Sequence, residues 1–399
     1  MALLSGCSRK HTIWAIFLFG FALLFVTYAH FQLDANQIQF EIQTNGDRNN
    51  DSEKMEQPAE FKTILYWNDF FGIEDFTFGF GREPFIQAQC PISTCQVTND
   101  RSQFNGSQVV VFSAQNLNFS DLPPHRFSHQ RFVFFEMESP VNTDPQSMLD
   151  PRTRFSFFNW TMTYRLDSDI VQRDSYGFVV PRSKHPISAM SYPTFQHNVT
   201  TSSPSPSSGK KKLAAWFVSN CVTSIHREDY VKELGRHVPV DIYGKCGNLS
   251  CGDGCLEMIR SDYKFYVAFE NSFCTDYVTE KLTRALLYDA VPIVMGGVDY
   301  NRFAPPHSFI NAKDFDSPEQ LGNYLLLLNA SDSLYGRYFE WKRHFNVQLT
   351  TKQGWCHLCK LANDDRLPSK TYDDIFQWWV DDPDTCNLKV GDTPIQRTS

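Results

Sequence analysis

The stretch from Tyr263 to Gly297 places polar side chains where an expected strand gives way to an expected helix. It starts as an apolar run, breaks at residues 270–276 (ENSFCTD), and then resumes with apolar positions on one helix face (Val278, Leu282, Ala285 and Leu286). Thr275 or Asp276 would cap that helix. In an α/β sheet, ligands bind beyond the carboxyl ends of the strands, and the free N–H groups of the next helix favour an anion. A diphosphate suits this place.

Two charged residues fall in the first turn of the expected helix. Lys281 would add a positive charge beside the anion, and Glu280 could accept hydrogen bonds from sugar hydroxyls. The alternative interpretation is a charged pair on a solvated helix face.

The run FENSFCTDYVTEKL, followed by VPIVMGG, resembles the signature of the α1,3/4-fucosyltransferases, an inverting family with a GT-B fold. In that family the tyrosine, glutamate and lysine of the D-Y-x-T-E-K run contact GDP-fucose. The resemblance implies this role for Tyr277, Glu280 and Lys281. The glutamate and asparagine of F-E-N-S correspond to Glu270 and Asn271, which are further expected donor-site residues.

A second family feature is V-S-N followed by an arginine at the start of a helix. It matches residues 218–220 with Arg227, so the resemblance adds Ser219 and Asn220 to the expected donor site. Arg227 would hold the diphosphate from the side opposite Lys281.

The first half of the chain resembles the family through RFVFFEMESP (131–140) and FNWTMTYRLDSDI (158–170). The family's catalytic base is the glutamate of E-S-P, here Glu138, which follows an extended apolar run at a proline turn. An inverting transfer needs such a base to take the proton of the attacking acceptor hydroxyl. Glu136 has the same strand parity and is the second candidate.

Asp167-Ser168-Asp169 has the Asp-x-Asp spacing of a metal-nucleotide site in another glycosyltransferase fold. In the resembled family this segment is structural or lies on the acceptor side, and Lys, Arg and a helix end neutralise the diphosphate. The resemblance therefore implies no obligatory cofactor and leaves room for stimulation by Mn²⁺ or Mg²⁺.

The acceptor and the linkage are less well defined by the sequence. Vertebrate members carry a His-His-Trp or His-His-Arg segment that influences α1,4 against α1,3 transfer, and its counterpart here is Phe112-Ser113-Ala114. Because Ala114 takes the discriminating place, α1,3 is expected only as the usual family outcome. The expected acceptor is a GlcNAc residue of a glycoprotein glycan, in an N-glycan core or in an antenna.

The periodicity around these motifs predicts an α/β protein. Expected strands cover residues 62–67, 108–112, 131–135, 213–218, 240–243, 264–269 and 292–295, with helices at 227–236 and about 277–288. The β-α-β order in the second half is that of a parallel sheet. With the resemblance, the expected fold is GT-B-like: two Rossmann-like lobes facing a cleft.

The 399-residue chain is too long for one small core. We expect a cytosolic tail (1–12), a transmembrane anchor (13–29), a polar flexible stem (30–60), an acceptor-side lobe (61–199), a Ser/Pro-rich linker with three lysines (200–212), a GDP-fucose-binding lobe (213–350) and a cysteine-containing C-terminal segment (351–399). The uncharged run Ile13–Ala29 follows Arg9 and Lys10, which predicts a single-pass type II membrane protein, and the family resemblance implies the Golgi membrane. A cleaved signal peptide is the alternative.

Two further features fit a luminal catalytic part. Seven asparagines begin N-x-S/T triplets (Asn50, Asn105, Asn118, Asn159, Asn198, Asn248 and Asn329), and ten of the 11 cysteines follow the expected anchor. The resemblance implies that Cys90 and Cys95 bond to Cys356 and Cys359, although C-H-L-C also has the spacing of half a zinc site. Aromatic residues such as Trp378 and Trp379 are expected to pack in a core.

The net charge of −8 gives no electrostatic reason to expect nucleic acid. Two other functions stay open from the residues: a luminal glycan-binding protein without activity, and a transferase for another nucleotide sugar.

Overall fold

The computed structural model describes residues 61–143, 146–173, 176–182, 209–349, 352–381 and 386. The expected tail, anchor and stem lie outside these residues, and so does most of the expected linker. Within the described ranges, the structure contains no helix with the length and apolar content needed to span a membrane.

The first half of the described chain forms a parallel sheet of six strands in the order β2-β1-β3-β4-β5-β6. Its strands are β1 (Lys62–Tyr66), β2 (Cys95–Thr98), β3 (Val109–Ser113), β4 (Arg131–Glu136), β5 (Trp160–Thr163) and β6 (Ile170–Val171). Every residue of β3 and β5 is buried, as expected for parallel strands covered on both faces. The helices of this part are short: α2 (Glu83–Gln87), α3 (Gln146–Leu149) and α4 (Pro151–Arg154).

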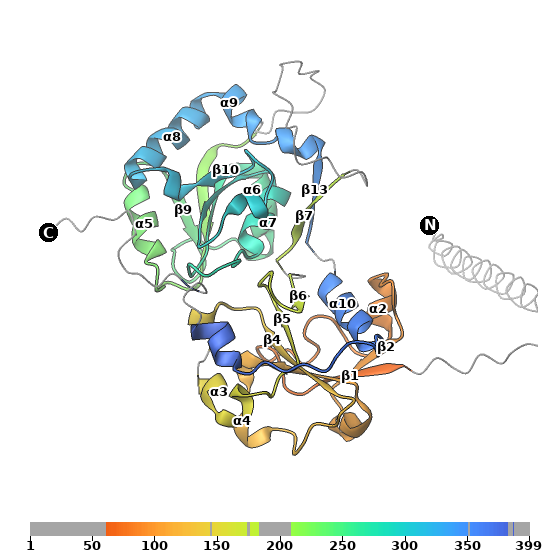
Figure 1. The fold of residues 1–399 in the computed structure, drawn as a ribbon. Helices are drawn as coiled ribbons and strands as arrows, with labels where there is room; N and C mark the ends of the chain where they lie inside the picture. Colours follow the sequence, from red (N-terminus) through yellow and green to blue (C-terminus); the bar gives the residue numbers. More distant parts are fainter. Residues whose placement is uncertain are drawn as a thin grey trace, which may run out of the picture. The chain divides into compact units, whose positions relative to one another are not determined.

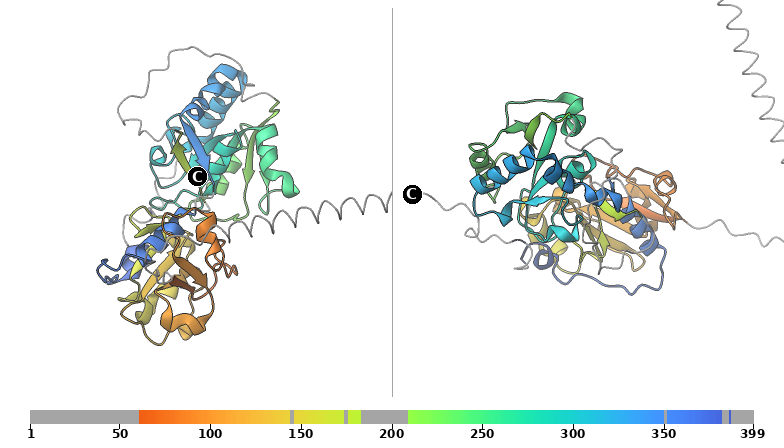
Figure 2. Two further views of the ribbon diagram at one scale, coloured as in Figure 1. Left: turned by 90° about the vertical axis from the view of Figure 1, so that its right-hand side faces the viewer. Right: turned by 90° about the horizontal axis from the view of Figure 1, so that it is seen from above.

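The C-terminal segment returns to this first sheet. Helix α10 (Gln353–Ala362) contributes Trp355, whose ring lies 5.4 Å from that of Tyr66 and 5.7 Å from that of Phe135. Figures 1 and 2 both place α10 beside α2 and β2. The disulfides Cys90–Cys356 and Cys95–Cys359 fasten it there, which confirms the expected pairing over the zinc alternative. Trp379, with 0% exposure, belongs to the same core, as predicted.

The second half forms a parallel sheet of five strands in the order β12-β11-β10-β8-β9. Its strands are β8 (Lys212–Phe217), β9 (Val240–Tyr243), β10 (Tyr263–Phe269), β11 (Val291–Met295) and β12 (Ile310–Asn311). Alternate residues of β10 face two separate cores. Helices α5 (Arg227–Leu234), α8 (Pro318–Ala330) and α9 (Asp332–Arg337) line one core, and α6 (Cys255–Asp262) and α7 (Glu280–Leu287) line the other (Figure 1). This is a doubly wound sheet.

A small antiparallel sheet links the two halves. Strand β7 (Phe178–Pro181) follows the first sheet and pairs with β13 (Phe345–Gln348), which follows the second. Three more disulfides, Cys221–Cys246, Cys251–Cys255 and Cys274–Cys386, complete the pairing of the ten cysteines. The expected α/β organisation with parallel sheets is confirmed.

Three lysines, Lys210 to Lys212, stand where the expected linker meets β8, and such a run is expected to lie in a solvated loop; Lys210 does not. Its ammonium is buried and donates to the carbonyl oxygens of Tyr263 and Asp289, each at 2.7 Å. Burial lowers the pKa of Lys210 to about 8. These two hydrogen bonds tie the segment just before β8 to β10 and to the turn after α7. Lys211 and Lys212 are exposed, as expected.

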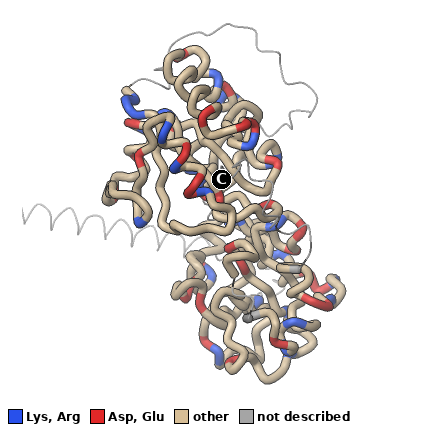
Figure 3. Tube along the Cα trace, turned by 90° about the vertical axis from the view of Figure 1, so that its left-hand side faces the viewer, with Lys and Arg blue, Asp and Glu red and all other residues tan. Residues whose placement is uncertain are grey.

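Charged residues of both signs are interspersed along the described trace (Figure 3). Some of the ion pairs among them join exposed residues close in sequence, such as Arg236–Glu233 and Arg366–Asp364. Exposed pairs of this kind contribute little to stability.

Candidate active site

Several of the expected site residues lie at the carboxyl ends of β8 and β10. The strand order changes direction between these two strands, and in doubly wound sheets ligands bind at that switch point. Ser219 and Asn220 follow β8 and are exposed, whereas Glu270 and Asn271 follow β10 directly. The structure therefore brings together two motifs that are about fifty residues apart in the sequence.

Arg227 joins the two strand ends. Its guanidinium is buried, with Nη1 donating to the carbonyl oxygen of Phe269 at 2.7 Å and Nη2 to that of Asn220 at 3.3 Å. Its Nε is buried without a partner among the described residues. Burial lowers the pKa of Arg227, partly offset by the charge of Glu270. The arginine thus orders the loop after β8 and keeps a cationic group at the switch point.

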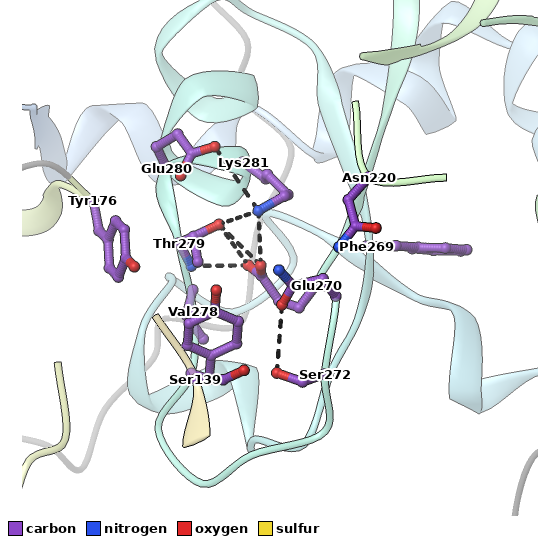
Figure 4. Close-up of polar contacts among 12 residues, drawn as sticks. Ser139, Tyr176, Asn220, Phe269, Glu270, Ser272, Val278, Thr279, Glu280 and Lys281 are labelled. Atoms are coloured by element: carbon purple, nitrogen blue, oxygen red, sulfur yellow. Dashed lines mark hydrogen bonds and ion pairs between the residues drawn. The ribbon is translucent and has the colours of Figure 1, made fainter. Parts of the chain in front are cut away.

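Glu270 is the centre of a compact polar cluster (Figure 4). It is fully buried and accepts the backbone N–H of Thr279 at 2.8 Å, the Thr279 hydroxyl at 2.9 Å and the Lys281 ammonium at 3.0 Å. Lys281 also donates to the Thr279 hydroxyl at 2.6 Å. Figure 4 shows the Lys281 side chain extending back from α7 toward this carboxylate.

The electrostatics of the cluster keep Lys281 and Glu280 charged. Burial would lower the pKa of Lys281, but the carboxylates of Glu270 and Glu280 outweigh it and raise the pKa above its ordinary value. Burial would raise the pKa of Glu280, whose carboxylate lies 3.8 Å from Nζ of Lys281, but the charges of Lys281 and Arg284 hold it below its ordinary value. Lys281 therefore stays a cation at the start of α7.

Helix α7 begins at Glu280, three residues later than the sequence pattern predicts, and neither Thr275 nor Asp276 is its N-cap. Asp276 has a left-handed backbone (φ 59°), and its carboxylate accepts from Arg302 at 3.1 Å and from the backbone N–H of Leu166 at 3.0 Å. These tertiary contacts hold residues 276–278 out of the helix.

Tyr277 consequently points to the first half of the chain. It is buried, its ring lies 4.9 Å from that of Tyr164, and its hydroxyl donates to Oε2 of Glu138 at 3.1 Å. Glu138 is half-buried and lies two residues beyond the end of β4. The structure thus places the expected base in contact with the loop that leads into α7.

Glu136 has a different environment. It is fully buried, and its Oε1 accepts the backbone N–H groups of Met137 and Glu138, both at 2.8 Å. Burial raises the pKa of Glu136 to about 8, although these two N–H groups act in the opposite direction. A carboxyl without solvent exposure does not reach an acceptor hydroxyl, so the geometry favours Glu138 of the two candidates.

Three residues of the site were missed by sequence reasoning. Thr279 lies inside the D-Y-V-T-E-K run and could have been found there, because its hydroxyl is positioned by the motif itself. Arg173 is buried and donates to the carbonyl oxygen of Val278 at 3.0 Å, and burial lowers its pKa to about 10. Tyr176 is buried and donates to the carbonyl oxygen of Met137. Neither Arg173 nor Tyr176 belongs to a periodic pattern or a motif that would have identified it.

The Asp167-Ser168-Asp169 segment is engaged in protein contacts. Asp167 accepts two hydrogen bonds from Arg165, and Asp169 accepts the backbone N–H of Thr161 at 2.9 Å and the hydroxyl of Tyr372 at 3.0 Å. Among the residues that the structure describes, no group of three or more His, Cys, Asp or Glu side chains could hold a metal ion. Phe112, Ser113 and Ala114 are all buried at the end of β3.

Comparisons with known proteins agree on one family. A model described as glycosyltransferase family 10 (fucosyltransferase), C-terminal, matches residues 207–378, and one described as fucosyltransferase, N-terminal, matches residues 59–177. The α-(1,3)-fucosyltransferase C of Drosophila melanogaster is 38% identical over 347 residues, which cover 82% of this chain and 79% of the relative. A 3-galactosyl-N-acetylglucosaminide 4-α-L-fucosyltransferase of Bos taurus is 37% identical, with 71% and 74% covered.

A solved structure has the same fold. The crystal structure of an α1,3-fucosyltransferase with GDP-fucose matches with a TM-score of 0.51 and 18% identity, over 81% of this chain and 96% of that one. At this identity the similarity concerns the arrangement of the two sheets and their helices.

Proposed function

Because the chain belongs to glycosyltransferase family 10, the fucosyltransferases, we propose that it transfers L-fucose from GDP-β-L-fucose to a GlcNAc residue of a glycoprotein glycan, in α1,3 linkage and with inversion. The chain is a fucosyltransferase by this membership. The α1,3 linkage is supported by the Drosophila relative, and the bovine relative with a 4-linkage is the reason to measure it.

One observation supports the assignment of the reacting groups more than any other. The half-buried carboxylate of Glu138, from the end of β4, is hydrogen-bonded to Tyr277 in the loop that joins β10 to α7. A general base must lie within hydrogen-bond reach of the acceptor hydroxyl while the donor is bound nearby. The contact brings a base candidate from one sheet to the donor-side loop of the other.

The proposed reaction is a single in-line displacement at the anomeric carbon of fucose. The acceptor oxygen forms the new bond while the bond to the GDP oxygen breaks, and the proton of the hydroxyl passes to Glu138. The transition state resembles an oxocarbenium ion, as in glycoside cleavage. Attack from the face opposite the leaving group converts a β-linked donor into an α-linked product.

Negative charge accumulates on the departing GDP, so cationic groups at the switch point accelerate the step. The groups proposed for this role are Lys281 and the N-terminus of α7, together with Arg227 at the ends of β8 and β10. In this proposal Ser219, Asn220, Glu270, Asn271 and Glu280 complete the donor site, with Glu270 holding Lys281 in place at 3.0 Å. No obligatory metal is proposed, and stimulation by Mn²⁺ or Mg²⁺ is checked by assay before and after chelation.

We further propose that residues 13–29 anchor the chain in the Golgi membrane with the catalytic part in the lumen. In that compartment the exposed asparagines of N-x-S/T triplets accept glycans. Asn159 is an exception, because its buried side chain donates to the carbonyl oxygen of Lys370 at 2.7 Å and accepts from the backbone N–H of Phe132 at 2.8 Å. Glycosidase treatment of the full chain from a native host should shift its gel mobility, and a protein that does not shift contradicts the luminal placement.

Product analysis tests the function directly. The purified protein is incubated with GDP-fucose and either a core N-glycan or an N-acetyllactosamine acceptor, and the linkage of the product is determined. Thermal stabilisation by a panel of nucleotide sugars accompanies the assay, since only a ligand of the native state raises the melting temperature. Stabilisation by another nucleotide sugar instead of GDP-fucose contradicts the donor, and stabilisation by glycans without any product favours a glycan-binding protein.

A further inference from the structure

We propose that Glu136, Tyr176 and Tyr277 are positioning residues that together fix the backbone and the carboxylate of Glu138. We refer to these three side chains as the Glu138 clamp. The inference rests on the proposed function, in which Glu138 is the general base, and it assigns Tyr277 a different role from the donor contact that the family resemblance implies.

Glu138 needs support because it lies outside the sheet. Strand β4 ends at Glu136, and the next regular element is a short 3-10 turn at Pro140–Asn142. Residues 137–139 therefore have no strand ladder to hold them. A general base that is misplaced by about 1 Å loses on the order of 10²-fold in rate, so the turn must be held by side chains.

Glu136 binds the backbone of this turn through its carboxyl group. Its Oε1 accepts the N–H groups of both Met137 and Glu138 at 2.8 Å, so one oxygen fixes two successive peptide groups. The carboxyl is fully buried, and within the described ranges the hydroxyl of Thr143 is the other polar group near it. A carbonyl oxygen in the same place, as in glutamine, could accept the same two bonds.

Tyr176 holds the carbonyl side of the peptide group between Met137 and Glu138, whose N–H is bound by Glu136. Its hydroxyl donates to the carbonyl oxygen of Met137, the residue before Glu138. The backbone of Tyr176 is in turn bound to the donor-side helix, because the Thr283 hydroxyl of α7 donates to its carbonyl oxygen. The turn that carries Glu138 is thus tied to α7 through two hydrogen bonds.

Tyr277 holds the carboxylate itself. Its hydroxyl donates to Oε2 of Glu138 at 3.1 Å, and Oε1 accepts no hydrogen bond from the part of the chain that the structure describes. The ring is fixed by Tyr164 at 4.9 Å and by Tyr176 at 6.5 Å. Burial raises the pKa of Tyr277 well above its ordinary value, so the phenol remains a donor throughout the working range of pH. One carboxylate oxygen is therefore anchored and the other is left to take the proton.

Both tyrosines belong to segments that are ordered by α7, the helix whose N-terminus carries Lys281. Tyr277 precedes α7 in the chain, and Tyr176 is bound to its Thr283. The clamp therefore sets the position of the base relative to the helix that is proposed to bind the donor. None of the three side chains needs to touch a substrate for this role.

The test compares Tyr176→Phe and Tyr277→Phe with Tyr164→Phe as the matched control. Tyr164 lies in the same buried stack, and its hydroxyl has no hydrogen-bond partner among the described residues, so its removal should leave kcat unchanged. Each of the other two variants should lower kcat by about 10- to 100-fold, with the Kd for GDP-fucose and the melting temperature near the wild-type values. Glu136→Gln should retain kcat because it keeps the accepting oxygen, whereas Glu136→Ala should lose it.

A double variant separates positioning from other roles. If Tyr277 acts through Glu138, Tyr277→Phe should cause no further loss of kcat in a Glu138→Gln background. A multiplicative loss there, unchanged kcat in both tyrosine variants, or a weakened GDP-fucose Kd in Tyr277→Phe overturns the inference. If Glu136→Ala does not fold, the two tyrosine variants still decide. Absence of fucosyl transfer by the wild-type protein would instead reject the proposed function.

Discussion

At the scale of single residues, Glu136 and Glu138 share a strand parity but have opposite environments. Glu138 is half-buried, and one of its carboxylate oxygens accepts a hydrogen bond from Tyr277. Glu136 is fully buried, and its carboxyl accepts backbone N–H groups of the turn. We expect Glu138→Gln to lower turnover by about 10²- to 10⁴-fold, because the variant cannot accept the proton, while GDP-fucose binding is retained. Turnover at saturating acceptor and calorimetric titration with GDP-fucose check the two parts. Near-normal turnover in this variant would place the base elsewhere.

The raised pKa of Glu136 predicts how stability depends on pH. The pKa is about 8 in the folded protein and about 4.5 in the unfolded chain, so the folded state binds more protons between these values and its stability falls as pH rises through them. The cost is complete above pH 8 and amounts to about 5 kcal/mol at most. Glu136→Gln removes this cost, so its free energy of unfolding should exceed that of the wild type by an amount that grows from pH 5 to pH 8.

Denaturant unfolding at several pH values measures that difference. Glu138→Gln serves as the control, because it replaces a carboxylate two residues away that is partly exposed. A constant difference across the range would mean that Glu136 is ionised in the folded protein.

Residues inside one contiguous motif can be proposed as site residues from the sequence, as Tyr277, Glu280 and Lys281 were. The contact of Tyr277 with Glu138 could not be predicted, because the two residues are 139 positions apart in the sequence. Tyr176 and Arg173 carry no local signal at all, since their partners are backbone carbonyl groups of distant segments. Contacts to backbone atoms place no constraint on the type of the partner residue and leave no pattern in a single sequence.

At the scale of elements, the seven strands expected from the sequence were correct to within about one residue at each end, because apolar runs of parallel strands are distinctive. The other strands that the structure describes, such as β2 and β5, were not predicted. The start of α7 at Glu280 could not be predicted in this way. Val278 continues the apolar face of Leu282 and Leu286, so the pattern extends the helix backward. The helix does not extend back to Val278, because Asp276 has a left-handed backbone and its carboxylate accepts hydrogen bonds from Arg302 and Leu166. These contacts depend on the tertiary structure.

The polar cluster at the start of α7 predicts different effects for single and double variants. Lys281→Met leaves the buried Glu270 carboxylate without its cation, which should cost about 3 kcal/mol of stability and abolish tight GDP-fucose binding. Adding Glu270→Gln should restore most of the stability, because no unpaired charge is left buried, but should not restore binding. Thermal unfolding and titration with GDP-fucose distinguish the two effects. A double variant that binds the donor normally would exclude Lys281 from the donor site.

At the scale of the whole molecule, the parallel sheet of the second half was predicted from periodicity and the two-lobe organisation from the family resemblance, but the path of the C-terminal segment was not predicted. Helix α10 packs on the first sheet although more than 250 residues separate it from β2. Local sequence patterns do not show which sheet a helix so distant in the sequence packs against. Its cysteines were assigned through the family resemblance alone, and Trp355 at the centre of the first core was not singled out.

The two disulfides that fasten α10 predict a strongly non-additive effect on stability. Cys90–Cys356 and Cys95–Cys359 span 266 and 264 residues and are only a few residues apart at each end. While one remains, it closes the long loop, so removing the other relaxes only a short ring and should cost about 3 kcal/mol in the loop-entropy treatment. Removing both opens the long loop as well and should cost about 8 kcal/mol. Unfolding of the paired Cys→Ala variants, each alone and combined, measures these values. If the combined loss equals the sum of the two single losses, constraint of the unfolded chain is not what these bonds contribute.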